Sequence, residues 1–334
     1  TANRLMFTNS GATALTDSAD LTFDGTNFGV GSQNGIAFGG TRYLYASSTN
    51  DSVTFGENAG ASFKSSTIYN VAIGFEAGRY ASSTDTDRSN LIGYQAGYNN
   101  IGAYNNIIGS GAGHENTGWY NNLIGADAGY NNTGDDNNLI GDDAGYHNTG
   151  SDNEMIGHGA GRNLQSTSSV IIGSEAYRGG AGTAAFQAIN NTALGYRAGY
   201  SAQTGASNNI LLGYQAADNI TTGANNIVIG YDVDIASTTR SNQLNIGNLI
   251  FGTGIDGTGT SLSSGNIGIG TTTPGSRFAI EKLTFTGAGV AGITQNIRST
   301  NVTASAVQYG NFGYLYASNT ATTTIAGNMF KIED

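Results

Sequence analysis

Residues 121–146 read NNLIGADAGYNNTGDDNNLIGDDAGY, and the second half of this stretch repeats the first after 16 residues. The unit Asn-Asn-Leu-Ile-Gly-x-x-Ala-Gly recurs along the middle of the chain. We call the Gly that follows the apolar pair the anchor glycine. From Gly93 to Gly173 the anchor glycines are 16 residues apart five times running, and elsewhere the interval reaches 22 residues. The anchor glycines are Gly56, Gly74, Gly93, Gly109, Gly125, Gly141, Gly157, Gly173, Gly195, Gly213, Gly230 and Gly247.

Residues at fixed distances from the anchor glycine form equally regular columns. An Ala follows three residues after the anchor, an Asn precedes it by four in most repeats, and a Gly precedes it by seven in the regular stretch. The alanine column is Ala59, Ala77, Ala96, Ala112, Ala128, Ala144, Ala160, Ala176, Ala198 and Ala216. The asparagine column is Asn70, Asn105, Asn121, Asn137, Asn153, Asn191, Asn209 and Asn226. The preceding glycines are Gly102, Gly118, Gly134 and Gly150.

This period predicts an all-β fold, a parallel β-solenoid (β-roll) of coils of about 16 residues. Helical-hairpin repeats need about 34 residues and propeller blades about 40. We expect two short strands and two turns in each coil, with strands of successive coils pairing in parallel about 4.8 Å apart. Stacked Asn amides can then bond to one another. Gly supplies turn conformations with positive φ, and Ala allows a close approach where the coil is narrow.

In most repeats both residues directly before the anchor glycine are apolar. Neighbouring strand residues face opposite sides, and a coil has one interior, so one member of each pair must face outward. The pairs are Leu91-Ile92, Ile107-Ile108, Leu123-Ile124, Leu139-Ile140, Met155-Ile156, Ile171-Ile172, Leu211-Leu212 and Val228-Ile229. Either column fits the pattern, so which one faces outward stays open. Such a stripe is typical of interfaces. We expect it to pack against sister chains, in a homotrimer with an axial apolar core or in a helical filament.

Composition excludes several classes of function. Among 334 residues there are 52 Gly, one Pro (Pro274) and no Cys. The 13 Lys and Arg are scattered among 24 Asp and Glu, and the net charge is −11, so no basic stripe is present for nucleic acid. Without Cys there is neither a disulfide nor a thiolate metal site. No apolar run approaches the roughly 18 residues of a membrane span. The chain starts at Thr1 without Met, which we interpret as a processed or excised piece of a longer protein.

The pattern Asn-x-x-Ile-Gly-x-x-Ala resembles the head repeats of trimeric autotransporter adhesins, which are left-handed parallel β-rolls associated as trimers. It is also similar to repeats of large bacterial and phage tail-fibre proteins, in which segments like Leu21–Gly31 and Gly265–Pro274 link modules. The resemblance covers roughly residues 51–250, and the flanking motifs extend it to about 20–275. It implies a fibre scaffold on a cell surface or a virion, and it leaves the handedness of this solenoid open.

Four segments follow from these patterns. We expect an N-terminal β-module at 1–50, the β-solenoid at 51–250, a connector at 251–275 and a C-terminal β-module at 276–334. The sequence Tyr-Leu-Tyr-Ala-Ser occurs at Tyr43–Ser47 and again at Tyr314–Ser318. It is either a strand type that both modules use or a sign that the two ends are equivalent pieces of a longer fibre, or mate head to tail.

Polar side chains that could carry chemistry are few. His114, His147 and His158 occupy three different columns, which favours turn or surface positions over a catalytic group. Asp127 and Asp143 share one column, and Asp136 and Asp152 share another, so each pair should lie about one coil spacing apart. Ca²⁺ would relieve the repulsion between such carboxylates. Solvated turn residues explain them equally, and no Gly-Gly-x-Gly-x-Asp calcium-binding repeat is present.

Two further columns and two tripeptides have structural and functional interpretations. Thr117, Thr133 and Thr149 suggest an ice-binding array, but three ranks are few and turn chemistry explains them. A tyrosine column, which could bind glycans or pack along the coil edge, stands five residues after the anchor at Tyr98, Tyr130, Tyr146 and Tyr200. The tripeptides Asn131–Thr133 and Asn301–Thr303 match N-glycosylation acceptors.

The sequence therefore predicts an extracellular structural fibre or surface-appendage subunit that assembles through apolar stripes on the solenoid and has an adhesive role as one option. We expect no catalytic, cofactor-binding or metal residues, and a cell-surface glycan as a further candidate partner. The alternative is a polysaccharide-binding or polysaccharide-degrading β-solenoid such as a phage tail-spike. An enzyme of that kind needs carboxylates that converge with a basic residue in a cleft, and short uniform coils are poorly suited to build one.

Overall fold

In a computed structural model, residues 51–63, 68–81, 88–179 and 186–280 are described, and before residue 51 only the strands are. These residues contain strands, turns and bends, and no helix. None of them forms a segment with the helical length and apolarity that crossing a membrane requires. The expected C-terminal module after residue 280, with Tyr314–Ser318 and Asn301–Thr303, lies outside the described residues.

The N-terminal strands pair antiparallel. Strands β1 (Arg4–Thr8), β2 (Leu15–Phe23) and β3 (Phe28–Val30) form a three-stranded sheet of their own. Strand β4 (Ile36–Phe38) pairs antiparallel with β5 (Thr41–Ser47), and β5 pairs antiparallel with β6 (Ser52–Phe55). From β6 onward the pairing becomes parallel.

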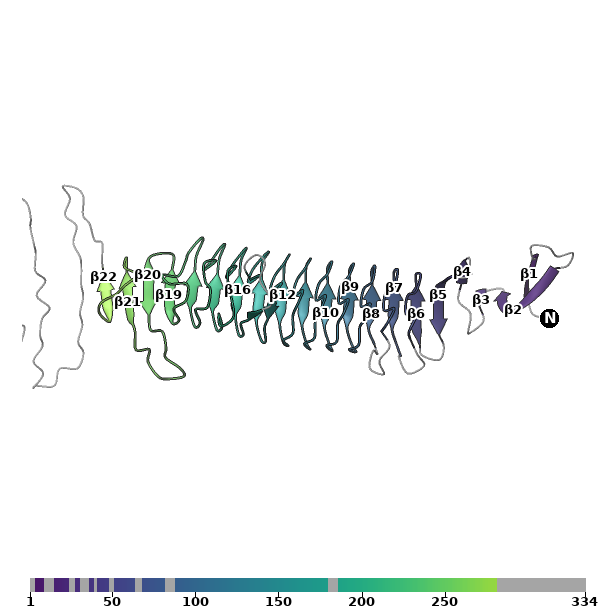
Figure 1. The fold of residues 1–334 in the computed structure, drawn as a ribbon, viewed down its shortest axis with the longest axis horizontal. Coiled ribbons are helices and arrows are strands. Elements are labelled where there is room, and N and C mark those ends of the chain that lie inside the picture. The colour runs from purple at the N-terminus through teal and green to yellow at the C-terminus, as the bar shows by residue number, and fades with distance from the viewer. Residues whose placement is uncertain are drawn as a thin grey trace, which may run out of the picture. The chain divides into compact units, whose positions relative to one another are not determined.

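The middle of the chain is a parallel β-solenoid of about ten turns, as the sequence predicted. Figure 1 shows its strands side by side in chain order. Each anchor-glycine repeat adds one strand, and Asn122, Leu123 and Ile124 pair with Asn138, Leu139 and Ile140 of the next coil. After β6 these strands are β7 (Val71–Ile73), β8 (Asn90–Ile92), β9 (Asn106–Ile108), β10 (Asn122–Ile124), β11 (Asn138–Ile140), β12 (Glu154–Ile156), β14 (Val170–Ile172), β16 (Thr192–Leu194), β17 (Ile210–Leu212), β18 (Ile227–Ile229) and β19 (Gln243–Ile246).

The prediction of two strands in each coil was wrong for most coils. The second wall is still bonded from coil to coil, because the Asn99 and Ile101 N–H groups donate to the His114 and Asn116 carbonyls at 2.7 and 2.9 Å. Left-handed residues two and four positions after the anchor, such as Gly129 (φ 56°), turn the chain into this wall and keep its extended part short. In the part of the chain that the structure describes, this wall contains one strand pair, β13 (Leu164–Gln165) with β15 (Phe186–Gln187).

The solenoid interior settles which apolar column faces inward. The inner aliphatic column, two residues before the anchor, is fully buried, with Leu123 and Leu139 both 0% exposed. It packs with the alanine column in one continuous core. The outer aliphatic column, one residue before the anchor, faces outward, and Ile172 is 37% exposed. Its members are Ile73, Ile92, Ile108, Ile124, Ile140, Ile156, Ile172, Leu194, Leu212 and Ile229.

Two columns of Asn share the interior with these apolar side chains. In the asparagine column the side-chain oxygen accepts the backbone N–H of its equivalent in the next coil, as from Asn121 to Asn105 at 2.8 Å. The amide-to-amide bonding that we expected in this column is present from Asn153 to Asn137, at 2.9 Å. A second column, Asn100, Asn116, Asn132 and Asn148, does bond amide to amide at 2.7–2.9 Å. Both columns are buried, and most of their polar atoms are paired, as is usual for buried groups. The exceptions are amide nitrogens of the first column, at Asn70, Asn121, Asn191 and Asn226, which have no acceptor.

The direction of strand pairing changes again at the C-terminal end of the solenoid. Strand β19 pairs antiparallel with β20 (Ile250–Thr253), and β20 pairs antiparallel with β21 (Asn266–Ile269). Strand β21 then pairs parallel with β22 (Phe278–Ile280). Antiparallel pairing thus changes to parallel pairing after β6 and back to antiparallel pairing after β19.

Candidate interaction surfaces

The outward side of the parallel sheet is the first candidate surface. In each three-residue strand the middle residue is buried and the two flanking residues face outward, as in β11 with Asn138, Leu139 and Ile140. We call the first and third residues of the three-residue strands from β7 to β18, with Val53 and Phe55 of β6, the outer sheet face; β13 and β15 belong to the second wall. It is apolar at both ends of the solenoid, where Phe55 is 54% and Ile210 40% exposed.

The centre of the outer sheet face carries a ladder of amides beside the outer aliphatic column. The Asn106 side chain donates to the Asn122 side chain at 2.9 Å, and Asn122 donates to Asn138 at 2.7 Å. Asn138 then donates to a carboxylate oxygen of Glu154 at 2.7 Å. Glu154 is the one charged residue of the outer sheet face, so this surface is almost free of charge in a protein of net charge −11.

Exposed aromatic rings follow the C-terminal end of the strands, directly after the anchor glycine. Phe75 and Tyr94 stack with ring centroids 5.5 Å apart. Tyr196, Tyr214 and Tyr231 stack at 5.2 and 5.0 Å, and Tyr231 is 76% exposed. This column was not predicted from the sequence, although each of these rings directly follows an anchor glycine.

A second exposed ladder precedes the strands, five residues before the anchor. The Arg88 guanidinium lies 5.3 Å from the ring centroids of both Tyr69 and Tyr104. Tyr104 stacks on Tyr120 at 4.8 Å. Such cation–π and stacking contacts hold long side chains in place at the surface. The outer sheet face is thus bordered by ordered aromatic side chains in part of its length, whereas central coils have Ser110, Ala126 and Asp142 after the anchor glycine.

The predicted tyrosine column forms a stack with one of the histidines. Tyr98, His114, Tyr130 and Tyr146 stack in that order, with centroids 4.7, 4.7 and 5.0 Å apart and nearly parallel planes. Arg162 ends the stack, 5.3 Å from the Tyr146 centroid. Because these rings cover one another's faces, the central ones present edges and not the open faces that a sugar would need. Burial in the stack lowers the pKa of His114. Tyr200 occupies the same column and lies beside Arg197, at 4.9 Å.

The two pairs of carboxylates differ in their burial and in their charged neighbours. Asp143 pairs with Arg162 at 3.1 Å. Burial, followed by the charges of Asp143 and Asp142, raises the pKa of Asp127. Asp136 and Asp152 are exposed turn residues with φ of 55° and 61°. Within the described ranges no three His, Asp or Glu side chains come together as a group that could hold a metal ion.

The remaining candidate residues lie apart from one another. His158 approaches Asp142 at 3.8 Å on an exposed surface. The His147 Nδ1 atom is 3.1 Å from the Asn131 amide nitrogen, and burial lowers the pKa of His147. Asn131, the potential glycosylation acceptor, is therefore engaged by a neighbour. Thr117, Thr133 and Thr149 are all exposed on the second wall of the coils.

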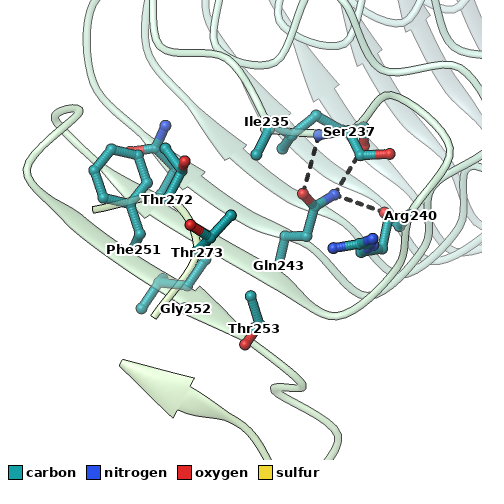
Figure 2. Close-up of a pocket in the computed structure, with 12 residues that line it drawn as sticks. Ile235, Ser237, Arg240, Gln243, Phe251, Gly252, Thr253, Thr272 and Thr273 are labelled. Carbon is teal, nitrogen blue, oxygen red and sulfur yellow. Dashed lines mark hydrogen bonds between the residues drawn. The ribbon is translucent and has the colours of Figure 1, made fainter. Parts of the chain in front are cut away.

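A cavity of about 200 Å³ lies where the last parallel coil meets β20, and Figure 2 shows its lining. Gln243 takes the place of the buried Asn here, and its amide nitrogen donates to the carbonyls of Ser237 and Arg240 at 2.9 and 2.7 Å. Its side-chain oxygen accepts the Ser237 N–H at 3.2 Å. Asn245 replaces an inner aliphatic residue and donates to the Asp234 carbonyl at 2.6 Å. These bonds close the apolar core with satisfied polar groups, which indicates a structural end cap.

Comparison with known proteins gives no relative. No protein-family model matches the chain, and neither a curated protein nor a solved structure does. The β-solenoid fold therefore stands on the geometry above, and the resemblance to adhesin heads and tail fibres stays a prediction from the repeat pattern.

Proposed function

We propose that this chain is a structural fibre or surface-appendage subunit that self-associates through the outer sheet face. The observation that carries the proposal is a nearly uncharged face along the parallel sheet, with exposed apolar side chains at both ends and an amide ladder beside half-buried isoleucines at its centre. Its outward residues include exposed Val53, Phe55, Val170, Ile172, Leu194 and Ile210. Soluble monomers rarely leave a contiguous apolar patch of this extent uncovered.

The size of the face fits a protein interface. About ten turns at about 4.8 Å and a width of three strand residues give roughly 500 Å². The aromatic columns along both edges bring this area closer to the roughly 800 Å² that one partner contributes to a specific interface. An apolar sheet face of this kind is typically covered by another sheet or chain.

We favour a second copy of the chain as the partner of this face, and a homotrimer as the assembly. A basic partner would find only Glu154 on this face, whereas an identical apolar face matches it in chemistry. A closed threefold arrangement lets each chain contact two others and leaves no open stripe, in keeping with the closed symmetry of most homo-oligomers. A helical filament built on non-closing contacts is the competing assembly.

The experiment places two carboxylates on the outer sheet face. Ile124→Asp with Ile140→Asp should leave the circular dichroism spectrum unchanged and reduce the particle mass to that of a monomer. A matched control, Thr133→Asp with Thr149→Asp, adds the same charges to the second wall and should keep the wild-type mass. Leu123→Asp with Leu139→Asp buries both charges in the core and should prevent folding.

Mass measurement of the wild-type particle decides the assembly. A monomer contradicts self-association, and an open helical lattice without a threefold axis removes the trimer while leaving the fibre proposal. An extracellular location, on a cell or a virion, belongs to the same proposal and is supported by the repeat resemblance. Antibody labelling of intact cells or particles tests it. We propose a scaffold and not an enzyme, and robust release of reducing ends from polysaccharides would overturn that choice.

A further inference from the structure

The second wall of the coils presents a surface of opposite character to the outer sheet face. Buried Asn side chains join the two walls across the interior, as Asn137 donates to Asn132 at 3.3 Å. The residues on either side of this inward-facing Asn, six and eight positions after the anchor, lie on the outside. Asn131 and Thr133 are one such pair. We call these two columns the polar face.

The polar face consists mainly of amides and hydroxyl groups on a fixed backbone. The Glu115 and Thr117 N–H groups donate to carbonyls of the next coil at 2.8 and 2.9 Å. Each coil thus sets its pair of side chains one strand spacing, about 4.8 Å, from the next pair. The neutral donors and acceptors of this face are therefore preorganised in a regular array, which lowers the entropic cost of binding a ligand.

A groove of about 710 Å³ lies on this face, within the range of small-ligand sites. It is lined by the Asn99 and Asn131 amides, the Thr117 and Thr133 hydroxyl groups and the Glu115 carboxylate. Two apolar side chains, Tyr80 and Ile101, complete the lining, and each is 46% exposed.

Two side chains of the groove are held in place by their neighbours. The Tyr80 ring packs edge-on against Tyr98, with centroids 5.0 Å apart, and the Arg79 guanidinium lies 5.1 Å from its centroid, so a half-exposed aromatic ring is fixed at one end. The Asn131 side-chain oxygen is buried and accepts no hydrogen bond, while its nitrogen lies against His147 at 3.1 Å. That oxygen is enclosed by the protein, so the Asn131 amide is a fixed part of the groove wall.

We propose that the polar face binds a neutral polysaccharide along the groove from Tyr80 to Asn131. Sugar rings combine apolar C–H faces, which pack on Tyr80 and Ile101, with hydroxyl groups that bond to the Asn and Thr side chains. Glu115 accepts a hydroxyl hydrogen and repels anionic polymers, as does the net charge of −11. This inference concerns the wall opposite the outer sheet face and holds whether or not the chain trimerises.

Affinity electrophoresis with neutral polymers (dextran, galactomannan and arabinoxylan) and one anionic polymer, alginate, tests the proposal. At least one neutral polymer should retard the wild-type protein, and alginate should not. Tyr80→Ala should weaken that retardation at least tenfold. Thr117→Val with Thr133→Val removes two hydroxyl groups at nearly constant shape and should weaken it as well. Tyr231→Ala, on the exposed column after the anchor glycines, is the matched aromatic control and should bind as the wild type does.

The possible outcomes separate the two proposals. Tyr80→Ala and the threonine double variant should keep the particle mass of the wild type, so a change in mass concerns assembly and not the groove. Absence of retardation by all three neutral polymers overturns the polysaccharide site, and so does retardation by alginate alone. Equal binding by wild type, Tyr80→Ala and the threonine double variant also overturns it, because the polymer would then lie elsewhere.

Discussion

The anchor glycine is the residue at which neighbouring coils come closest. Gly125 has φ of 138°, and a Cβ atom there would lie 2.4 Å from the Gly141 carbonyl oxygen of the next coil. Real Cβ atoms do not approach a carbonyl so closely, and L-residues avoid this φ. The column therefore depends on glycine for two reasons that act together, a backbone conformation and the space between coils.

Gly125→Ala should destabilise the protein by about 3 kcal/mol, from backbone strain and forced separation of two coils. Urea unfolding followed by circular dichroism measures the change. Gly247→Ala is the matched control, because its φ is 59° and nothing lies within 4 Å of the added Cβ. It should cost only about 1 kcal/mol, for the left-handed conformation. Equal losses for the two variants would contradict a role for the close approach.

A second residue-scale prediction concerns the charge of Asp127. Its pKa is raised by burial and then by Asp143 and Asp142, so the folded protein binds this proton more tightly than the unfolded chain does. The stabilisation is present below the ordinary Asp pKa and is lost as pH rises through the raised value. Asp127→Asn should therefore stabilise the protein at pH 7 by about 0.5 kcal/mol, because it relieves repulsion between like charges in the turns of adjacent coils.

Thermal unfolding between pH 3 and pH 7 measures this effect. Asn also suits the left-handed backbone at this position, where φ is 50°. The stability advantage of Asp127→Asn should grow from pH 3 to pH 7, whereas a purely conformational gain would be the same at both. Asp136→Asn, in an exposed left-handed position of φ 55°, is the matched control for the conformational gain.

At the scale of the strand, two adjacent asparagines have different tasks. Asn137 is 2% exposed, and its side-chain oxygen accepts the Asn153 backbone N–H at 3.1 Å. Its amide nitrogen donates to the Gly150 carbonyl at 2.9 Å. Asn138 belongs to the half-buried amide ladder on the outer sheet face. Loss of Asn137 thus leaves buried backbone groups without partners, while water can replace Asn138.

Asn137→Ala should cost about 3 kcal/mol, and Asn138→Ala less than about 1 kcal/mol. Chemical denaturation of the two variants, which differ by one position in the sequence, gives the comparison directly. Asn137 is a better test than Asn121, whose amide nitrogen is buried without an acceptor. A loss at Asn138 as large as that at Asn137 would show that the outer ladder also determines the fold.

The same elements show how far sequence reasoning reached. The constant interval between the central anchor glycines predicted parallel stacking. When every coil has the same length, each residue pairs in register with its equivalent in the next coil. Which of the two aliphatic columns faces the interior was not predictable, because Leu123 and Ile124 are equally apolar. The preceding turn decides which of the two side chains points into the coil. The second asparagine column was missed because Asn116 and Asn132 stand in polar stretches that read as loop. The bordering aromatic stacks were missed because their columns are interrupted in the central coils, although Tyr94 and Tyr196 directly follow their anchor glycines.

At the scale of the whole molecule, self-association should link stability to protein concentration. A partner that binds only the folded chain raises the midpoint of thermal unfolding by mass action. The midpoint of the wild type should therefore rise by several degrees across a hundredfold increase in concentration. Ile124→Asp with Ile140→Asp should unfold at a midpoint that does not depend on concentration, and calorimetry at three concentrations measures both. A wild-type midpoint that stays constant would contradict assembly through this face.

The in-register pairing of 16-residue coils also bears on how genes for such chains change. Deleting residues 125–140 would join Ile124 to Gly141 and leave every column in place, because Leu123 and Leu139 already stack as equivalents. Duplicating the same block would add one rung, about 4.8 Å, with both faces continued. Unequal recombination between neighbouring repeats can thus alter the length of the stack in whole steps without a folding penalty. An insertion or deletion that is not a whole repeat must instead be accommodated in a turn, as in the longer interval between Gly173 and Gly195.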